Sequence, residues 1–306
     1  MSMSSPPPPP PPQPQPYFTL TFLGGAGLTG LTPILTQAGC SGKLHKAEVL
    51  YSKHSSSHLT DPAGKHVSAA VALSAAKSAL FSSVPSCPLS SSPAGLAATT
   101  VLPTDGSSNT HCRSYVALAT LWSCELWSLD LNGLPRPSAF DAVGDLVGSL
   151  VSGSPVAASV PPPVSVSSGP EWAYELLTSS PHPLMIPTVP STLPASVTLL
   201  PGSFNPLHSG HVSMLRHGAL SADEGWLELS VANVDKPTVT LEDARARLEG
   251  LGGRRAVLSN CATFERKMEA LGGRDVEFRV GGDTVVRVFD KKYYGGDERE
   301  MEEAAA

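Results

Sequence analysis

The sequence predicts an α/β protein with two folded segments, on three observations. From residue 196 onward, short apolar runs typical of buried strands alternate with stretches of helical spacing. Residues 17–132 combine strand-like runs with an Ala-rich helical stretch. The chain has 306 residues, which leaves room for about two domains. Strands that alternate with helices predict a parallel sheet with right-handed crossovers.

The chain opens with a proline-rich tail over residues 1–16, in which Pro6 to Pro12 are consecutive. Such a run lacks backbone donors and favours an extended polyproline II conformation. We expect a disordered tail of biased composition. The alternative is a ligand for a partner module with an aromatic groove.

Residues 17–132 are expected to form a folded α/β segment. Its predicted elements are strands over 18–23, 47–51 and 115–121 and a helix over 67–81. Residues 133–195 are then expected to form an interdomain linker, because prolines recur there among Ser, Val and Ala. Only short elements near 140–150 and 171–177 are predicted within it.

Residues 196–306 are predicted to form the second folded segment. Thr240 with Asp243 resembles a capping box that opens a helix, and glycines at 250, 252 and 253 supply its stop. The expected order is strand 197–200, helix 210–220, strand 226–232, helix 240–250, strand 256–258, helix 262–271, strand 276–280 and helix 284–289.

Composition limits the classes of partner that the chain is expected to bind and the compartments in which it is expected to reside. The 21 Lys and Arg against 27 Asp and Glu give a net charge of -6, which argues against binding to a nucleic-acid backbone. No apolar run is long enough to span a membrane. Five cysteines without a CxxC pair argue against a disulfide framework and a structural zinc site. We therefore expect a soluble, intracellular and cytoplasmic protein.

The most informative stretch is Leu200 to His211, where the first strand of the second segment passes into its first helix. Nucleotide phosphates bind at this position in parallel α/β folds. Gly202 would let the backbone approach a nucleotide, and Gly210 would let the helix begin close to the ligand. His208 and His211 could both face a triphosphate and stabilise the charge that develops on its oxygens. The alternative is two exposed histidines that cap a surface helix.

The run Gly202-Ser203-Phe204-Asn205-Pro206-Leu207-His208-Ser209-Gly210-His211 resembles the HxGH signature of the nucleotidylyltransferase superfamily. Its Gly-Ser-Phe-Asn-Pro prefix is most similar to the nicotinamide/nicotinate mononucleotide adenylyltransferase branch. The resemblance implies a Rossmann-like domain with His208 and His211 as catalytic residues. It implies nucleotide or substrate binding by Gly202, Ser203, Phe204, Asn205 and Gly210.

Downstream segments extend the resemblance. Lys236 follows a run similar to the strand end that meets the mononucleotide in that branch, and Arg247 matches a position where the branch carries arginine. Gly281 and Asp283 are similar to the segment near the adenosine ribose, where an Asp accepts bonds from hydroxyls. The alternatives are a solvated turn lysine, a surface-helix arginine and, for Asp283, an N-cap.

The sequence departs from the family at its end. Members carry an Ile-Ser-Ser-Thr-x-x-Arg pattern that holds the β and γ phosphates of ATP, and the printed sequence ends at Ala306 without it. We therefore expect a C-terminally truncated sheet, one strand–helix unit short. Each missing charge-assisted contact is worth roughly 1.5 to 3 kcal/mol, so weaker ATP binding and turnover are expected.

The first segment resembles a CinA C-terminal-like domain, a family that includes nicotinamide-nucleotide amidohydrolases. The resemblance is carried by dispersed runs at residues 20–27, 37–41, 48–53, 95–100 and 110–117. Active members place a serine ahead of a Thr-Gly-Gly turn, whereas this chain has Thr21-Phe22-Leu23-Gly24-Gly25. We expect this segment to be weak or inactive as an amidohydrolase.

The function that these resemblances imply is Mg²⁺-dependent transfer of an adenylyl group from ATP to nicotinamide or nicotinate mononucleotide, with release of pyrophosphate. Metal use follows from the chemistry alone, because no carboxylate cage is visible in the sequence. One alternative is a cytidylyltransferase that acts on a phosphorylated alcohol. Another is a non-catalytic module that binds nucleotides or a partner.

Overall fold

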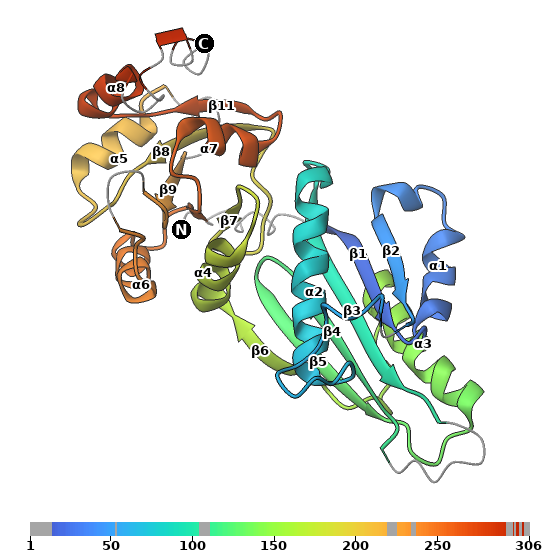
Figure 1. Cartoon of the computed structure of the whole chain (residues 1–306). Coiled ribbons are helices and arrows are strands. Elements are labelled where there is room, and N and C mark those ends of the chain that lie inside the picture. The colour runs from blue at the N-terminus through green and yellow to red at the C-terminus, as the bar shows by residue number, and fades with distance from the viewer. Residues whose placement is uncertain are drawn as a thin grey trace, which may run out of the picture. The chain divides into compact units, whose positions relative to one another are not determined.

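The computed structural model describes residues 14–52, 54–103, 111–218, 225–233, 237–291, 296, 298–299 and 302. It divides into two compact units. Unit 1 comprises Met1–Thr120, Trp127–Pro162 and Val189–Leu193, and unit 2 comprises Leu121–Leu126, Pro163–Thr188 and Pro194–Ala306. Both contain strands and helices, which confirms the predicted α/β class (Figure 1). In the described part of the chain, no helix is both long and apolar enough to cross a membrane.

The first sheet has the strand order β2-β1-β3-β4-β5-β6. Strand β1 is parallel to β2 and to β3, whereas β3 pairs antiparallel with β4, and β5 with β6. The strands are β1 (Gln15–Leu23), β2 (Leu44–Leu50), β3 (Ser91–Val101), β4 (Arg113–Ala119), β5 (Ser123–Asp130) and β6 (Val164–Ser168). The helices of this part of the chain are η1 (Leu28–Leu31), α1 (Thr32–Leu35), η2 (Cys40–Gly42), α2 (Ala69–Ser83), η3 (Val84–Ser86) and α3 (Arg136–Ser152).

Small residues let the helices of unit 1 approach their neighbours closely. A Cβ atom on Gly95 of β3 would lie 2.0 Å from the Ala76 carbonyl oxygen of α2. A Cβ atom on Gly30 of η1 would lie 2.4 Å from the Gly144 carbonyl oxygen of α3. Phe22 and Val147 lie in the core between the sheet and α3. Because both contacts are with backbone atoms, glycine at positions 95 and 30 is a packing requirement.

The second sheet has the strand order β11-β8-β9-β10-β7. Strands β8 to β11 are parallel, and β7 pairs antiparallel with β10. Its strands are β7 (Met185–Pro187), β8 (Ser196–Pro201), β9 (Trp226–Ser230), β10 (Ala256–Ser259) and β11 (Asp275–Phe278). Its helices are α4 (Gly169–Ser179), α5 (Ser209–Arg216), α6 (Leu241–Gly250), α7 (Phe264–Leu271) and α8 (Gly282–Val288). From β8 to α8 the predicted alternation of strand and helix is confirmed.

Local capping explains where the helices of unit 2 begin and end. The Thr240 hydroxyl accepts a hydrogen bond from the Asp243 amide at 3.2 Å, and Thr263 accepts one from the Arg266 amide at 3.4 Å. Gly272, with φ +52°, ends α7 in the left-handed conformation.

The prediction of a linker over residues 133–195 is wrong, although the short elements predicted within it near 140–150 and 171–177 are present as α3 and α4. These residues form α3, β6, α4 and β7, and α3 contributes Val143 and Leu146 to the core of unit 1. Pro137 and Pro170 lie in the first turns of α3 and α4, where the missing amide hydrogen breaks no helical bond. These two prolines therefore mark the starts of α3 and α4.

The predicted tail is also too long. Gln15 and Pro16 belong to β1 and pair with Ser91 and Ser92 of β3. Residues 1–13, including the consecutive prolines, lie outside the described residues.

Candidate functional site

The strand order of unit 2 places a topological switch point between β8 and β11. From β8 the chain proceeds to β9 and then β10, and it returns to the other side of β8 to form β11. Right-handed crossovers place the connecting helices on opposite faces when the direction reverses in this way. Ligands of open α/β sheets bind in the crevice at the carboxyl ends of the strands beside such a point. The loops after β8 and β11 both emerge there.

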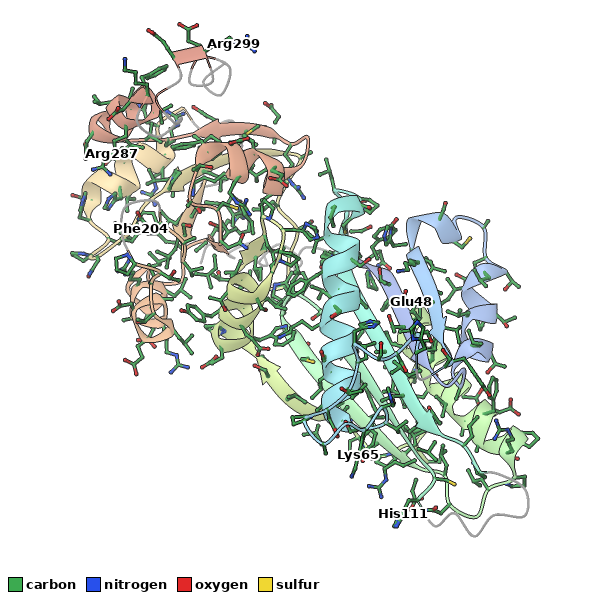
Figure 2. The ribbon with its side chains drawn as sticks, in the orientation of Figure 1. Glu48, Lys65, His111, Phe204, Arg287 and Arg299 are labelled. Atoms are coloured by element: carbon green, nitrogen blue, oxygen red, sulfur yellow. The ribbon has the colours of Figure 1, made fainter. Side chains whose placement is uncertain are left out.

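The loop after β8 is anchored by one glycine and one aromatic ring. The Gly202 amide donates to the Glu228 carbonyl oxygen of β9 at 3.0 Å. A Cβ atom on Gly202 would lie 2.7 Å from the Phe204 ring. Phe204, labelled in Figure 2, is 3% exposed and packs with Leu200 and Leu215 in the core of unit 2. Its side chain thus holds the loop, and its backbone has a φ of +45°, the one positive value at a described residue other than glycine.

His208 and His211 form a reciprocal capping box at the start of α5. The Nδ1 atom of His211 accepts from the His208 amide at 3.4 Å, and the His208 side chain accepts from the His211 amide. The two rings stack with centroids 3.7 Å apart, and the Phe204 ring meets the His211 ring edge-on at 5.3 Å. A Cβ atom on Gly210 would lie 3.1 Å from Nδ1 of His208. Glycine at this position therefore leaves room for the His208 ring.

The capping box fixes the tautomer of a neutral His211. An imidazole nitrogen that accepts from an amide carries no hydrogen, so a neutral ring then carries it on Nε2. Partial burial lowers the pKa of His211 below its ordinary value, and the charge of the adjacent His208 lowers it further. A neutral His211 ring can therefore present an Nε2–H donor at the carboxyl end of β8.

The other predicted site residues differ in how close they lie to the loop after β8. The Arg247 guanidinium of α6 donates to the Ser203 carbonyl oxygen at 3.5 Å, which brings it to the loop after β8. Gly281 is the N-cap of α8, and Asp283 is an exposed residue in its first turn, so Asp283 is not the N-cap. Asn205 is exposed beside Phe204. Lys236 lies outside the described residues.

One feature of unit 2 is missed by sequence reasoning: a buried ion pair between Glu228 of β9 and Lys267 of α7, with nitrogen and oxygen 2.8 Å apart. The only sequence signal is a glutamate inside the apolar run of β9, which reads equally well as a residue on a solvated strand face. Cys261 lies beside the pair, and burial raises the pKa of its thiol to about 11.

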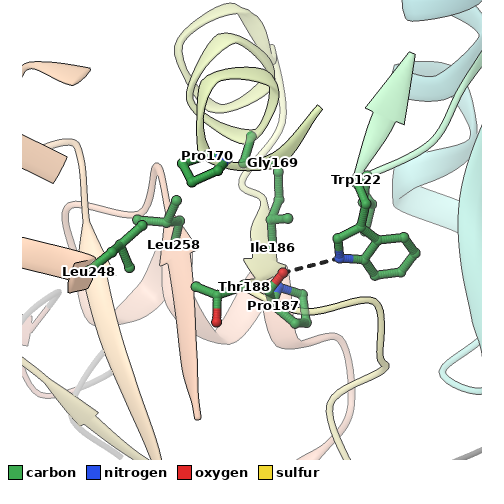
Figure 3. A pocket seen from close by; sticks show the side chains of 10 residues that line it. Trp122, Gly169, Pro170, Ile186, Pro187, Thr188, Leu248 and Leu258 are labelled. Atoms are coloured by element: carbon green, nitrogen blue, oxygen red, sulfur yellow. Dashed lines mark hydrogen bonds between the residues drawn. The ribbon is translucent and has the colours of Figure 1, made fainter. Parts of the chain in front are cut away.

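A small apolar cavity of about 40 Å³ lies elsewhere in unit 2 (Figure 3). Its lining includes Pro170 of α4, Ile186 of β7, Leu248 of α6 and Leu258 of β10. The Trp122 indole donates to the Pro187 carbonyl oxygen at its side, at 3.1 Å. The volume is enough for a few water molecules and too small for a nucleotide.

Unit 1 places a carboxylate beside the threonine that precedes its glycine turn. The Thr21 hydroxyl donates to Oε1 of Glu48 at 3.0 Å, and Glu48 also pairs with Lys46 at 2.8 Å. Thr21 is 3% exposed and lies within β1. A hydroxyl that is buried on an inner strand and bonded to Glu48 is not accessible to a substrate, so Thr21 does not serve as a nucleophile in this arrangement.

The sequence matches no family model and no curated protein. Among solved structures, the chain is similar to the competence or damage-inducible protein from Enterobacter asburiae, with TM-score 0.35 and 11% identity over 44% of this chain and 86% of that one. It is similar to competence damage-inducible protein A (ComA) from Klebsiella pneumoniae subsp. pneumoniae MGH 78578, with TM-score 0.32 and 14% identity over 44% and 85%.

A third structure, the CinA superfamily protein KP700603 from Klebsiella pneumoniae 700603, gives TM-score 0.32 and 12% identity over 45% of this chain and 88% of that chain. At such TM-scores the fold class rests on the strand order and the helices of the chain itself.

Proposed function

We propose that unit 2 is a nucleotidylyltransferase that transfers the adenylyl group of ATP to nicotinamide or nicotinate mononucleotide. The observation that carries the proposal is the pair His208 and His211, stacked at the first turn of α5 where β8 ends at the switch point. The HxGH resemblance of the same residues supports this reaction class.

The reaction needs positioning and charge stabilisation more than proton transfer. A phosphate oxygen of the mononucleotide attacks the α-phosphorus of ATP, the bond from that phosphorus to the oxygen bridging the β-phosphate breaks, and pyrophosphate leaves. The nucleophile is already an anion, so no protein base is required. The imidazole N–H groups of His208 and His211 would donate to the triphosphate oxygens as charge builds on them.

Other residues would hold the two substrates. The backbone at Gly202 and Ser203 would approach the nucleotide, with Arg247 beside it. Gly281 and Asp283, at the carboxyl end of the adjacent strand β11, would receive the adenosine ribose. Lys236 remains a predicted phosphate contact.

Magnesium would enter the reaction as part of the substrate. Within the described ranges, no group of three histidine, cysteine, aspartate or glutamate side chains could hold a metal ion. The site residues thus do not fit a resident Mg²⁺, and the ion would enter as the complex of Mg²⁺ with ATP.

The direct test is pyrophosphate release from ATP with either mononucleotide and Mg²⁺. The wild-type chain is compared with His208→Ala, His211→Ala and the matched control His217→Ala, an exposed histidine at the C-cap of the same helix. Loss of about two to three orders of magnitude in kcat for the first two variants, with the control unchanged, would support the proposal.

Two other results would assign a different function to unit 2. Preference for CTP with a phosphorylated alcohol, measured in competition with ATP, would identify a cytidylyltransferase. Nucleotide binding without pyrophosphate release would identify a binding module. Equal activity of all three variants would exclude a catalytic role of the histidine pair.

A further inference from the structure

The buried ion pair of unit 2 is linked to the loop that carries the candidate site, because the Gly202 amide of that loop donates to the main-chain carbonyl oxygen of Glu228. Glu228 of β9 is 1% exposed and Lys267 of α7 is 5% exposed. The Lys267 ammonium donates to both carboxylate oxygens of Glu228, each at 2.8 Å. Neither residue belongs to the predicted site.

The pair is fully hydrogen-bonded. The third hydrogen of the Lys267 ammonium is donated to the Cys261 carbonyl oxygen at 2.8 Å, so all three have acceptors. The Ser259 hydroxyl donates to Oε1 of Glu228. Every bond has a fixed direction, and such a network specifies one geometry in a way that apolar packing does not.

The network connects the carboxyl ends of three neighbouring strands. On the β8 side, the Glu228 carbonyl oxygen accepts the Gly202 amide at 3.0 Å. On the β10 side, Lys267 holds the Cys261 carbonyl oxygen. The Ser230 hydroxyl at the end of β9 lies within bonding distance of the Cys261 carbonyl oxygen at 3.0 Å and the Ala232 carbonyl oxygen at 2.8 Å. The loops after β8, β9 and β10 all begin at these atoms.

Stability alone does not account for such a pair. Replacing a buried ion pair by apolar side chains of similar size is often neutral or stabilising, because two charges must be desolvated to form it. What the charges add directly is the bond from Lys267 to the Cys261 carbonyl oxygen, which the Ser230 hydroxyl also approaches. They also fix the side chain of Glu228, whose main-chain carbonyl oxygen accepts the Gly202 amide. An apolar pair cannot supply the bond to Cys261.

We propose that Glu228 and Lys267 are positioning residues that hold the loops after β8, β9 and β10 in the geometry that binds the two substrates. The inference rests on the proposed function for its catalytic consequence. Its structural part, the control of loop order by the ion pair, can be tested without any ligand.

The first measurement is hydrogen exchange of the full chain. The variants are Lys267→Met, Glu228→Gln, the double variant, and the control Arg266→Met, an exposed residue on the same helix. We expect the three core variants to exchange the amides of residues 202–203, 231–233 and 260–263 at least about tenfold faster, and the control to match wild type. Amides of α5 and of β3 in unit 1 should be unchanged.

The double variant separates positioning from stability. It removes both charges, so it should recover most of the unfolding free energy that either single variant loses, while the loops remain unprotected and turnover remains low. A misplacement of about 1 Å can reduce rate a hundredfold, so a loss of kcat/KM of about that size is expected. Recovery of loop protection and turnover together would overturn the inference, because the charges would then be purely structural.

The outcomes also separate this inference from the proposed function. If wild type releases no pyrophosphate but the loops exchange faster in the double variant, the proposed reaction fails and the positioning role stands. If turnover falls while loop exchange is unchanged, the positioning role is wrong.

Discussion

His208 and His211 cap one another at the start of α5 while their rings stack 3.7 Å apart between centroids. His211 thus fulfils a structural role through Nδ1 and leaves Nε2 for a ligand. Because the two roles use different atoms of the ring, they can be separated by substitution.

His211→Asn should keep the helix and lose the reaction. The asparagine carbonyl oxygen can accept from the His208 amide in place of Nδ1, but its amide does not extend to the position of Nε2. We expect unfolding free energy within about 0.5 kcal/mol of wild type, against a loss of about 1 kcal/mol for His211→Ala. Urea unfolding and pyrophosphate release of both variants check this; equal turnover of His211→Asn and wild type would contradict a donor role for Nε2.

The lowered pKa of His211 predicts a specific pH dependence of stability. Partial burial is its main cause and the neighbouring His208 adds to it. Between this lowered pKa and the ordinary value near 6.5, the unfolded chain binds more protons than the folded chain. The contribution of His211 to the unfolding free energy is therefore fully present above about pH 6.5, and it is lost as the pH falls through that window.

Urea unfolding at about pH 8 and about pH 5.5 measures the effect. Wild type should lose more unfolding free energy between the two pH values than His211→Asn, which has no titratable side chain at position 211. An equal loss in both chains would show that His211 does not contribute.

Gly202→Ala should disturb the loop that carries the histidines. A Cβ atom there would lie 2.7 Å from the Phe204 ring, which is itself packed in the core, so the ring must shift. We expect a loss of about 1–3 kcal/mol in unfolding free energy and a fall in turnover. The control is Gly250→Ala at the end of α6, where a Cβ atom meets nothing within 4 Å and should be neutral or slightly stabilising.

The order of elements in unit 2 could be predicted because its signals are local. Thr240, Thr263 and Gly272 mark helix ends within a few residues of the chain they affect. The missed strand β3 shows the limit of that approach. It is built of Ser, Ala, Gly and Thr around Leu96, and its composition follows from the close packing of α2, which only the tertiary structure reveals.

In the candidate site, too, local signals could be predicted from the sequence and long-range contacts could not. The HxGH run predicts the histidines because all of its residues are contiguous. The Glu228–Lys267 pair joins residues 39 positions apart, and nothing near either residue indicates its partner. Phe204 was predicted as a binding residue, but whether an aromatic side chain meets a ligand or the core depends on the packing of Leu200 and Leu215.

Gly95→Ala should destabilise unit 1 and spare unit 2. The added Cβ atom would lie 2.0 Å from the Ala76 carbonyl oxygen and 2.3 Å from the Leu80 amide nitrogen, and both are backbone atoms of α2. Because neither can rotate away, the helix itself must move from the sheet, and we expect a loss of about 3 kcal/mol or more. The matched control is Gly42→Ala, where a Cβ atom meets nothing within 4 Å.

Tryptophan fluorescence in urea can follow the two units separately. The chain has four tryptophans, of which Trp127 lies in unit 1 and Trp226 in unit 2. Chains in which Trp127 or Trp226 is the single tryptophan left therefore report on one unit each. Gly95→Ala should lower the midpoint of the Trp127 transition and leave the Trp226 transition in place, while Gly42→Ala changes neither. Equal midpoints for Gly95→Ala and Gly42→Ala would contradict the close contact between α2 and β3, since an alanine tolerated at position 95 requires space that this packing does not contain.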